Sequence, residues 1–206
     1  MKKSILVLLT LSCISASLFA QKKLDALALY RSQKFAEAAA VCIQELQANP
    51  RNIDSYVVLC WSLVKDRKYA EAESYAIEGR KINASDSRLI EILGEAKYYL
   101  GKNTQALELF QLYVAAKESG ARLGNAYYYM GEIYIRQKQY LHADMALSSA
   151  VHAEPNVANW WSRCGYAREM AGYYLSSLEA YKKALALDAN HADAIRGKNR
   201  MEKRIN

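Results

Sequence analysis

Residues 124–157 read GNAYYYMGEIYIRQKQYLHADMALSSAVHAEPNV, and residues 158–191 repeat the pattern as ANWWSRCGYAREMAGYYLSSLEAYKKALALDANH. In both stretches a glycine stands nine residues before a tyrosine, and a small residue follows that tyrosine three positions later. A unit of this length that recurs along a chain is the sequence signature of a solenoid, in which copies of one supersecondary element stack on each other. The two stretches therefore predict a stacked repeat.

The same pattern runs through the rest of the chain in three columns. One column of small residues has spacings of 34, 34, 37 and 34 and consists of Ala26, Cys60, Gly94, Gly131 and Gly165. Two further columns keep these spacings, one at Ala38, Ala72, Ala106, Ala143 and Ser177 and the other at Phe35, Tyr69, Asn103, Tyr140 and Tyr174. Three columns in register predict five copies of one unit.

Each unit is expected to contain two antiparallel helices. In the second unit, apolar residues recur at intervals of three and four, which predicts helices over 53–66 and 69–82 with a turn at 67–68 between them. The second helix carries a small face of Ala72, Ala76 and Gly79, which allows two helix axes to come close. The spacing of 37 predicts a longer turn near residues 118–120, after a helix that ends near Ala116 or Lys117. No sheet is expected.

These residues resemble the tetratricopeptide repeat (TPR) motif, W-x2-L-G-x2-Y…A…F…A…P. The fourth unit carries the motif as Tyr127-x-x-Met130-Gly131-x-x-Tyr134, and the match covers about residues 22–191. The chain departs from the motif where Ala26 and Cys60 replace glycine and where Lys97 and Arg168 replace tyrosine; only Pro50 and Pro155 keep the proline.

The resemblance implies an all-α, right-handed α-solenoid of five helix-turn-helix repeats in an exported bacterial protein. The repeats are expected at about 21–52, 53–86, 87–123, 124–157 and 158–191, within a solenoid of residues 21–206. A last amphipathic segment, 192–204, is expected to cap the stack, because terminal repeats need a polar outer face.

The first twenty residues have the pattern of a secretory signal. Lys2 and Lys3 precede an apolar run that ends in small residues at Ala20, so we expect cleavage there and an exported, periplasmic protein that begins at Gln21. Cys13 leaves an alternative open, because Thr10-Leu11-Ser12-Cys13 loosely resembles a lipoprotein signal. A lipid anchor on Cys13 is the minor alternative.

The composition disfavours several classes of function. The net charge of +7 falls to +5 without Lys2 and Lys3, and most of the excess lies in residues 192–206, which does not predict a nucleic-acid surface. Three cysteines remain after cleavage, at positions expected in the core, so no disulfide framework is expected. We find no metal-ligand spacing, no phosphate-binding loop and no catalytic motif, so we expect no enzyme activity, no metal and no cofactor.

The resemblance to TPR proteins also implies a concave face lined by the first helix of each repeat. Its expected residues include an aromatic row and a small acidic group of Glu91, Glu95 and Glu132, which would suit a partner segment carrying lysine or arginine. The expected partner-binding residues are Tyr30, Trp61, Glu91, Glu95, Tyr98, Tyr128, Tyr129, Glu132, Arg163 and Tyr166. The carboxylate clamp of the family is not expected, because Leu27, Val58 and Glu91 occupy its positions.

Two functions fit this sequence. The first is a non-catalytic scaffold of the bacterial envelope that binds a peptide or helix of another envelope protein in the aromatic groove. The alternative is a periplasmic ligand-binding or transport-accessory protein that holds a small apolar molecule there. The sequence leaves the partner and the oligomeric state open.

Overall fold

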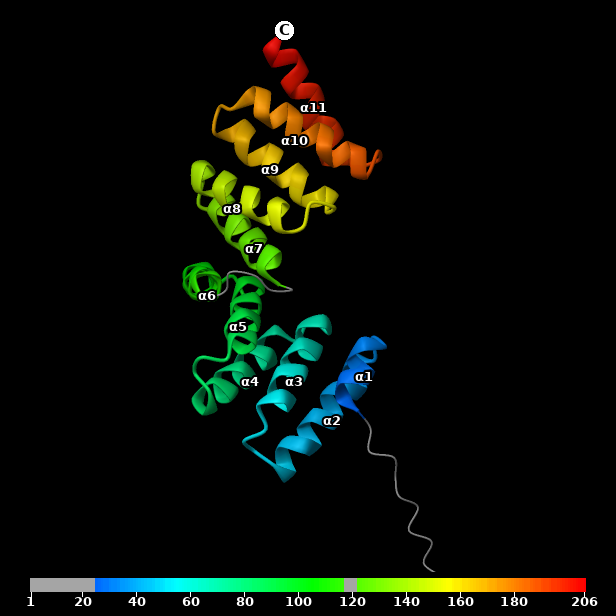
Figure 1. Ribbon diagram of the computed structural model, residues 1–206, viewed down its shortest axis with the longest axis vertical. Helices are drawn as coiled ribbons and strands as arrows, with labels where there is room; N and C mark the ends of the chain where they lie inside the picture. The colour runs from blue at the N-terminus through cyan, green and yellow to red at the C-terminus, as the bar shows by residue number, and fades with distance from the viewer. Residues whose placement is uncertain (1–24, 117–121) are drawn as a thin grey trace, which may run out of the picture.

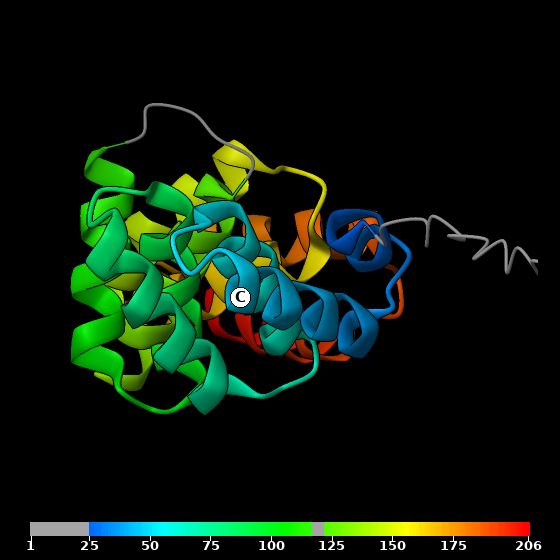
Figure 2. The same ribbon diagram turned by 90° about the horizontal axis from the view of Figure 1, so that it is seen from below.

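The computed structural model describes residues 25–116 and 122–206, and in these residues it contains eleven helices and no strand. The helices follow one another as a stack that rises from α1 and α2 at one end to α11 at the other (Figure 1). Viewed from below, the helix pairs wind around the long axis of the molecule (Figure 2). Their bounds are α1 Ala26–Arg31, α2 Phe35–Ala48, α3 Ile53–Lys65, α4 Tyr69–Ile82, α5 Ser87–Tyr99, α6 Asn103–Ala115, α7 Leu123–Arg136, α8 Tyr140–Ala153, α9 Ala158–Met170, α10 Tyr174–Leu187 and α11 Ala192–Ile205.

The all-α solenoid expected from the sequence is confirmed. Helix α4 has the expected bounds, and α3 ends at Lys65, one residue before the expected end. Helix α6 ends at Ala115, also one residue early, and the longer turn expected near 118–120 lies outside the described residues. The expected signal segment and Cys13 also lie outside them.

The two helices of each pair are joined by a turn with one residue in the left-handed region. These residues are Gln33, Arg67, Gly101, Lys138 and Gly172, with φ between 59° and 87°. They keep the spacings of the repeat, so one turn geometry recurs in all five pairs. Glycine adopts this conformation without strain, whereas a side chain adds a cost.

The cysteines Cys42, Cys60 and Cys164 are buried free thiols, which confirms their expected place in the core. Cys60 faces the small residues of α4, because its Sγ lies 3.6 Å from the carbonyl oxygen of Ala72. A disulfide between Cys42 and Cys60 is therefore absent from the described structure.

The helices of the last three pairs come close where a glycine faces a large side chain sixteen residues later. A Cβ on Gly94 would lie 2.9 Å from the ring of Phe110, one on Gly131 would lie 2.5 Å from Leu147, and one on Gly165 would lie 2.8 Å from Tyr181. Those distances are too short for a carbon–carbon contact, so the missing side chain is required. In the second pair the same register pairs Cys60 with Ala76.

This contact predicts a compensating pair of substitutions. Gly131→Ala should lower the free energy of unfolding by about 1–3 kcal/mol through overpacking, and Leu147→Ala should lower it by about 2–5 kcal/mol through a cavity. The double variant should lose clearly less than the sum, because the new methyl group enters the space that Leu147 leaves. Urea unfolding measures all three, and additive losses would contradict the proposed contact.

Candidate functional site

The first helix of each pair carries the residues expected on the concave face, and four of the expected aromatic residues are half-buried. Tyr30 and Trp61 lie together, with ring centroids 5.7 Å apart. Tyr128 stacks on Trp160 at 5.4 Å, and the guanidinium of Arg163 lies over the ring of Tyr166 at 5.2 Å. All four rings keep part of their surface exposed to solvent.

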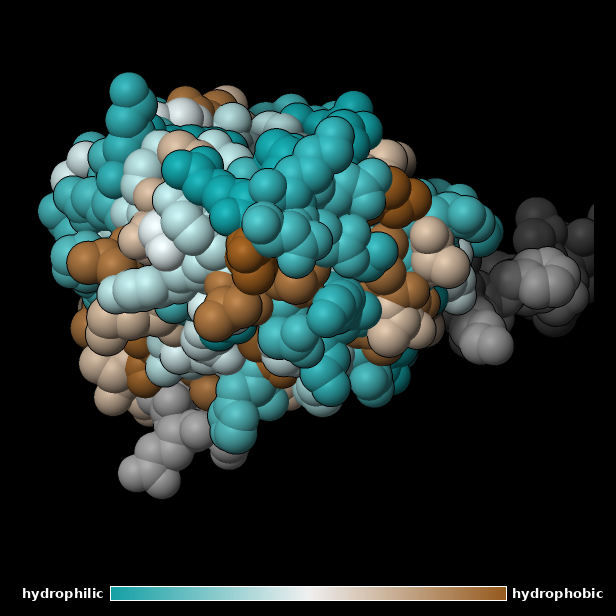
Figure 3. All heavy atoms as spheres, turned by 90° about the horizontal axis from the view of Figure 1, so that it is seen from above, coloured by the Kyte–Doolittle hydropathy of each residue, from teal (hydrophilic) through white to brown (hydrophobic). Residues whose placement is uncertain are grey.

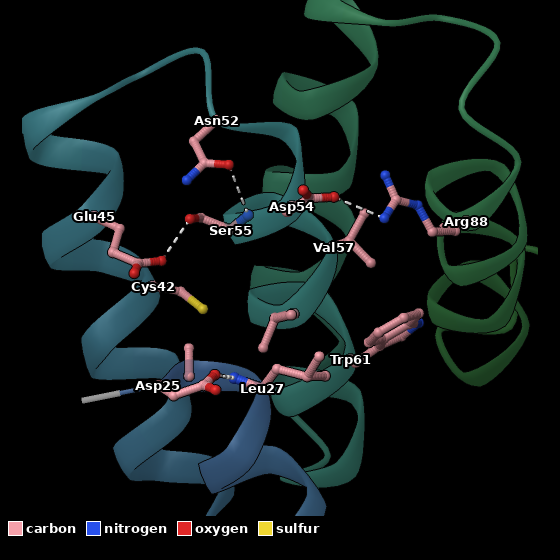
Figure 4. A pocket seen from close by; sticks show the side chains of 12 residues that line it. Asp25, Leu27, Cys42, Glu45, Asn52, Asp54, Ser55, Val57, Trp61 and Arg88 are labelled. Atoms are coloured by element: carbon pink, nitrogen blue, oxygen red, sulfur yellow. Dashed lines mark hydrogen bonds and ion pairs between the residues drawn. The ribbon is translucent and has the colours of Figure 1, made fainter. Parts of the chain in front are cut away.

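A pocket of about 610 Å³ opens at the N-terminal end of this face (Figure 4). The pocket lies beside the start of α1. Helix α1 has six residues, whereas the first helices of the later pairs have 13 or 14, so α1 covers less of the neighbouring helices. Asp25 lies in the pocket wall and caps the N-terminus of α1, since its carboxylate accepts hydrogen bonds from the backbone N–H groups of Leu27 and Ala28. Among residues 25–116 and 122–206, no helix covers the second half of α2 and the first half of α3 at this point.

The polar side chains in the pocket wall bind one another. The hydroxyl of Ser55 donates to Glu45 at 2.6 Å, and Arg88 donates to Asp54 at 2.7 Å (Figure 4). The side chains that remain to receive a ligand are mainly apolar. They are Ala26, Leu27, Cys42, Val57, Val58 and Trp61.

A carboxylate and an arginine connect each successive pair of first helices from α3 to α11. Arg88 of α5 contacts Asp54 of α3 at 2.7 Å, and Arg163 of α9 contacts Glu132 of α7 at 2.5 and 3.0 Å. Arg200 of α11 binds Glu169 of α9 through two contacts of 2.7 Å. The sequence contains a signal for three of these four connections that the repeat columns do not use: acid and arginine stand 31 residues apart at Glu91–Arg122, Glu132–Arg163 and Glu169–Arg200.

The most buried of these contacts joins α5 to the start of α7. Arg122 lies 2.6 Å from Glu91 and also binds Glu95, and both acids are almost fully buried. Tyr129 donates its hydroxyl hydrogen to Glu95 at 2.7 Å. Two carboxylates thus share one guanidinium, and burial raises the pKa of Glu91 to about 7, opposed by the charge of Arg122.

This arrangement corrects the expected acidic surface. Glu91 and Glu95 are bound inside the protein by Arg122, and Glu132 is bound by Arg163, so the three acids do not form an open site for a cationic partner. The sequence register placed them correctly on the first helices, but it did not include the arginines that the next helix contributes.

Two of the expected tyrosines are also buried. Tyr98 and Tyr129 are each 7% exposed, and their rings pack against each other at 4.8 Å. Arg136 covers Tyr98, with its guanidinium 4.2 Å from the ring centroid and 2.7 Å from the hydroxyl oxygen. These rings hold neighbouring repeats together, and their direct contact with a partner would require the repeats to move apart.

Residues 25–116 and 122–206 contain no group of three or more histidine, cysteine, aspartate or glutamate side chains placed to hold a metal ion. Among the same residues, none of the helices combines the length and the apolar character needed to cross a membrane.

Solved structures resemble this arrangement over most of the chain. A MamA structure matches with a TM-score of 0.69 at 19% identity, and the match covers 82% of this chain and 98% of that one. YrrB, described as a TPR protein with an unusual peptide-binding site, matches with a TM-score of 0.68 at 18% identity and covers 84% and 88% of the two chains. The fold is that of a TPR protein. MamA from Desulfovibrio magneticus RS-1 matches this TPR fold with a TM-score of 0.69 at 16% identity, over 81% and 92% of the two chains.

The sequence of this chain matches no protein-family model, and it matches no curated protein. The identities of 16–19% to the solved structures support the fold alone.

The buried acids predict how stability depends on pH. Because the pKa of Glu91 is raised from 4.5 to about 7 in the folded protein, the folded state holds its proton more tightly than the unfolded state does. The free energy of unfolding should therefore fall as pH rises through this range, and Glu91→Gln should remove that fall. Urea unfolding between pH 5 and 8 measures the slope, with Glu108→Gln on the exposed side of α6 as the control.

Arg122→Met in the same series should lower the free energy of unfolding by about 3–5 kcal/mol, because it leaves two buried carboxylates without a cation. If Glu91→Gln kept the slope of the parent protein, Glu91 would not be the group that titrates.

Proposed function

We propose that this chain is a non-catalytic scaffold of the bacterial envelope, which binds a peptide or a helix of a partner protein on its concave face. The observation that carries the proposal is the 610 Å³ pocket beside Trp61, at one end of a face that also presents half-buried Tyr128 and Tyr166. Tryptophan and tyrosine provide a large rigid contact area and dominate the binding energy of many interfaces. The peptide-binding site in the description of YrrB is a further reason to consider such a partner.

The envelope setting rests on the sequence of the first twenty residues. We propose that they direct export and are removed after Ala20, with lipidation of Cys13 as the alternative. Mass spectrometry of the exported protein separates the two, because a chain that begins at Gln21 and one that begins at diacylated Cys13 differ in mass and in their extraction from membranes.

A second function is supported by the size of the pocket. A volume of about 610 Å³ lies in the range of small-molecule sites, and the free wall is mainly apolar. A periplasmic ligand-binding or transport-accessory protein would hold a small apolar molecule there. Native mass spectrometry of the protein from its own cells distinguishes this function, since a retained small molecule adds a discrete mass.

The scaffold function is tested by site-specific cross-linking in living cells. A photoreactive residue at position 61, 128 or 166 should cross-link to one discrete protein, whereas the same residue at position 75, on the second helix of its pair, should not. Equal cross-linking from both faces would argue against a groove partner.

Once that partner is identified, substitution of the groove aromatics should weaken its binding. Trp61→Ala is expected to lower affinity by roughly thirtyfold, which corresponds to about 2 kcal/mol for a binding hot spot. Tyr75→Ala is the matched control, because Tyr75 is also a half-buried aromatic residue but lies on α4. Calorimetry measures binding and thermal unfolding measures the fold. Normal binding by the Trp61 variant would remove the pocket from the proposed site.

A further inference from the structure

One edge of the solenoid near its C-terminal end exposes several large apolar side chains. Met145 and Leu175 are each 70% exposed and Leu141 is 54% exposed, the highest values among the large apolar residues of the described structure. Tyr173, beside Leu175, is half-exposed as well. Seen from above, apolar residues interrupt the hydrophilic surface of this end of the molecule (Figure 3).

The fold does not require these side chains. At the position of Leu141 and Leu175, the first three repeats have Ala36, Ala70 and Thr104. At the position of Met145 they have Ala40, Ser74 and Glu108, and at that of Tyr173 they have Lys34, Lys68 and Lys102. The fold therefore accepts small or polar residues at these positions. The large apolar residues of the fourth and fifth repeats are not needed for packing and call for another explanation.

These residues form one continuous strip. A hollow of about 270 Å³ is lined by residues 138–142 and by Ala171, and a second hollow of about 480 Å³ is lined by residues 172–176 with Arg204 and Ile205. Because Ala171 and Gly172 are adjacent, the turn between α7 and α8, the turn between α9 and α10 and the end of α11 lie side by side. We call residues 138–142, 145, 171–176 and 204–205 the C-terminal strip, which includes Met145 because it lies one helical turn after Leu141 on α8.

The strip carries two cations, Lys138 and Arg204, and Arg204 lies over the ring of Tyr174 at 4.4 Å. Glu179 borders it, because this residue holds in the fifth repeat the position that Met145 holds in the fourth. The nearest acids along the chain are already bound to cations: Asp144 contacts Arg168 at 2.8 Å, Glu179 contacts Lys182 at 3.0 Å, and Glu202 contacts Lys198 at 3.2 Å.

We infer that the C-terminal strip binds the surface of an anionic lipid bilayer. Leu141, Met145 and Leu175 enter the boundary between headgroups and acyl chains, Tyr173 lies at the headgroup level, and the cations contact the lipid phosphates. Exposed apolar side chains bordered by cations, with the neighbouring acids paired, have the chemistry that peripheral membrane binding uses. The inference does not depend on the partner proposed for the concave face, because the strip includes none of the groove residues.

The test is co-sedimentation of the chain from Gln21 to Asn206 with vesicles. This chain keeps every described residue and lacks the apolar leader, which would itself enter a bilayer. Binding to vesicles of equal parts phosphatidylglycerol and phosphatidylcholine should be at least tenfold tighter than to pure phosphatidylcholine. It should also weaken as salt is raised from 50 to 500 mM, because salt screens the attraction.

Variants separate insertion of the apolar residues from attraction by charge alone. Leu141→Ser combined with Leu175→Ser should weaken binding to the anionic vesicles at least tenfold, and Lys138→Glu combined with Arg204→Glu should do the same. Leu112→Ser is the control, since Leu112 is 48% exposed on α6 outside the strip and its loss should leave binding unchanged. Circular dichroism should give the same helix content for every variant, because the substituted side chains are exposed.

Three results would overturn the inference. If the parent chain did not bind vesicles, the inference would be wrong, and a protein would be the remaining candidate partner for the strip. Parent-like binding by the double leucine variant would show that charge alone acts. Equal weakening by Leu112→Ser would show that binding does not occur through the strip.

Discussion

In the last three pairs, the distance between the two helices is set by a contact in which one side chain is missing. A glycine on the first helix lets a large side chain of the second helix lie directly against the backbone. The pairs are Gly94 with Phe110, Gly131 with Leu147 and Gly165 with Tyr181. A solenoid has no central core, so each pair has to be packed correctly before the next one can stack on it. The orientation of every first helix, and with it the form of the concave face, follows from this local packing.

Stacking then brings the first helices together, and their polar residues meet. Carboxylates that face a solvent groove in a single repeat become bound to arginines of the next repeat, as in Glu132 with Arg163 and Glu169 with Arg200. At Glu91 and Glu95 the burial is almost complete, and removal of one partner there is costly, whereas the pair itself adds little net stability. Such contacts fix which surfaces meet between repeats. Tyr30, Trp61, Tyr128 and Tyr166 remain less buried than Tyr98 and Tyr129.

The sequence predicted the fold closely because the repeat gives the same information several times. The column at Gly131 and the column at Tyr140 each identify one helix of the pair, and the bounds of α4 were obtained from them without error. The site was predicted less well. The register puts Glu91, Glu95, Tyr98 and Tyr129 on the first helices, but their burial depends on Arg122 and Arg136, whose side chains cross from one repeat to another. The pattern of a single repeat does not include side chains that the next repeat contributes.

The short first helix also affects how the stack behaves at its N-terminal end. In a linear array a terminal unit packs against one neighbour, and among the described residues α1 provides six residues where the later first helices provide 13 or 14. A molecule that fills the pocket beside Asp25 would contact both α1 and its neighbours. Because it would bind only when the first repeat is folded, its binding free energy would stabilise the folded form of that repeat. Occupancy of the pocket and order at this end of the protein therefore change together.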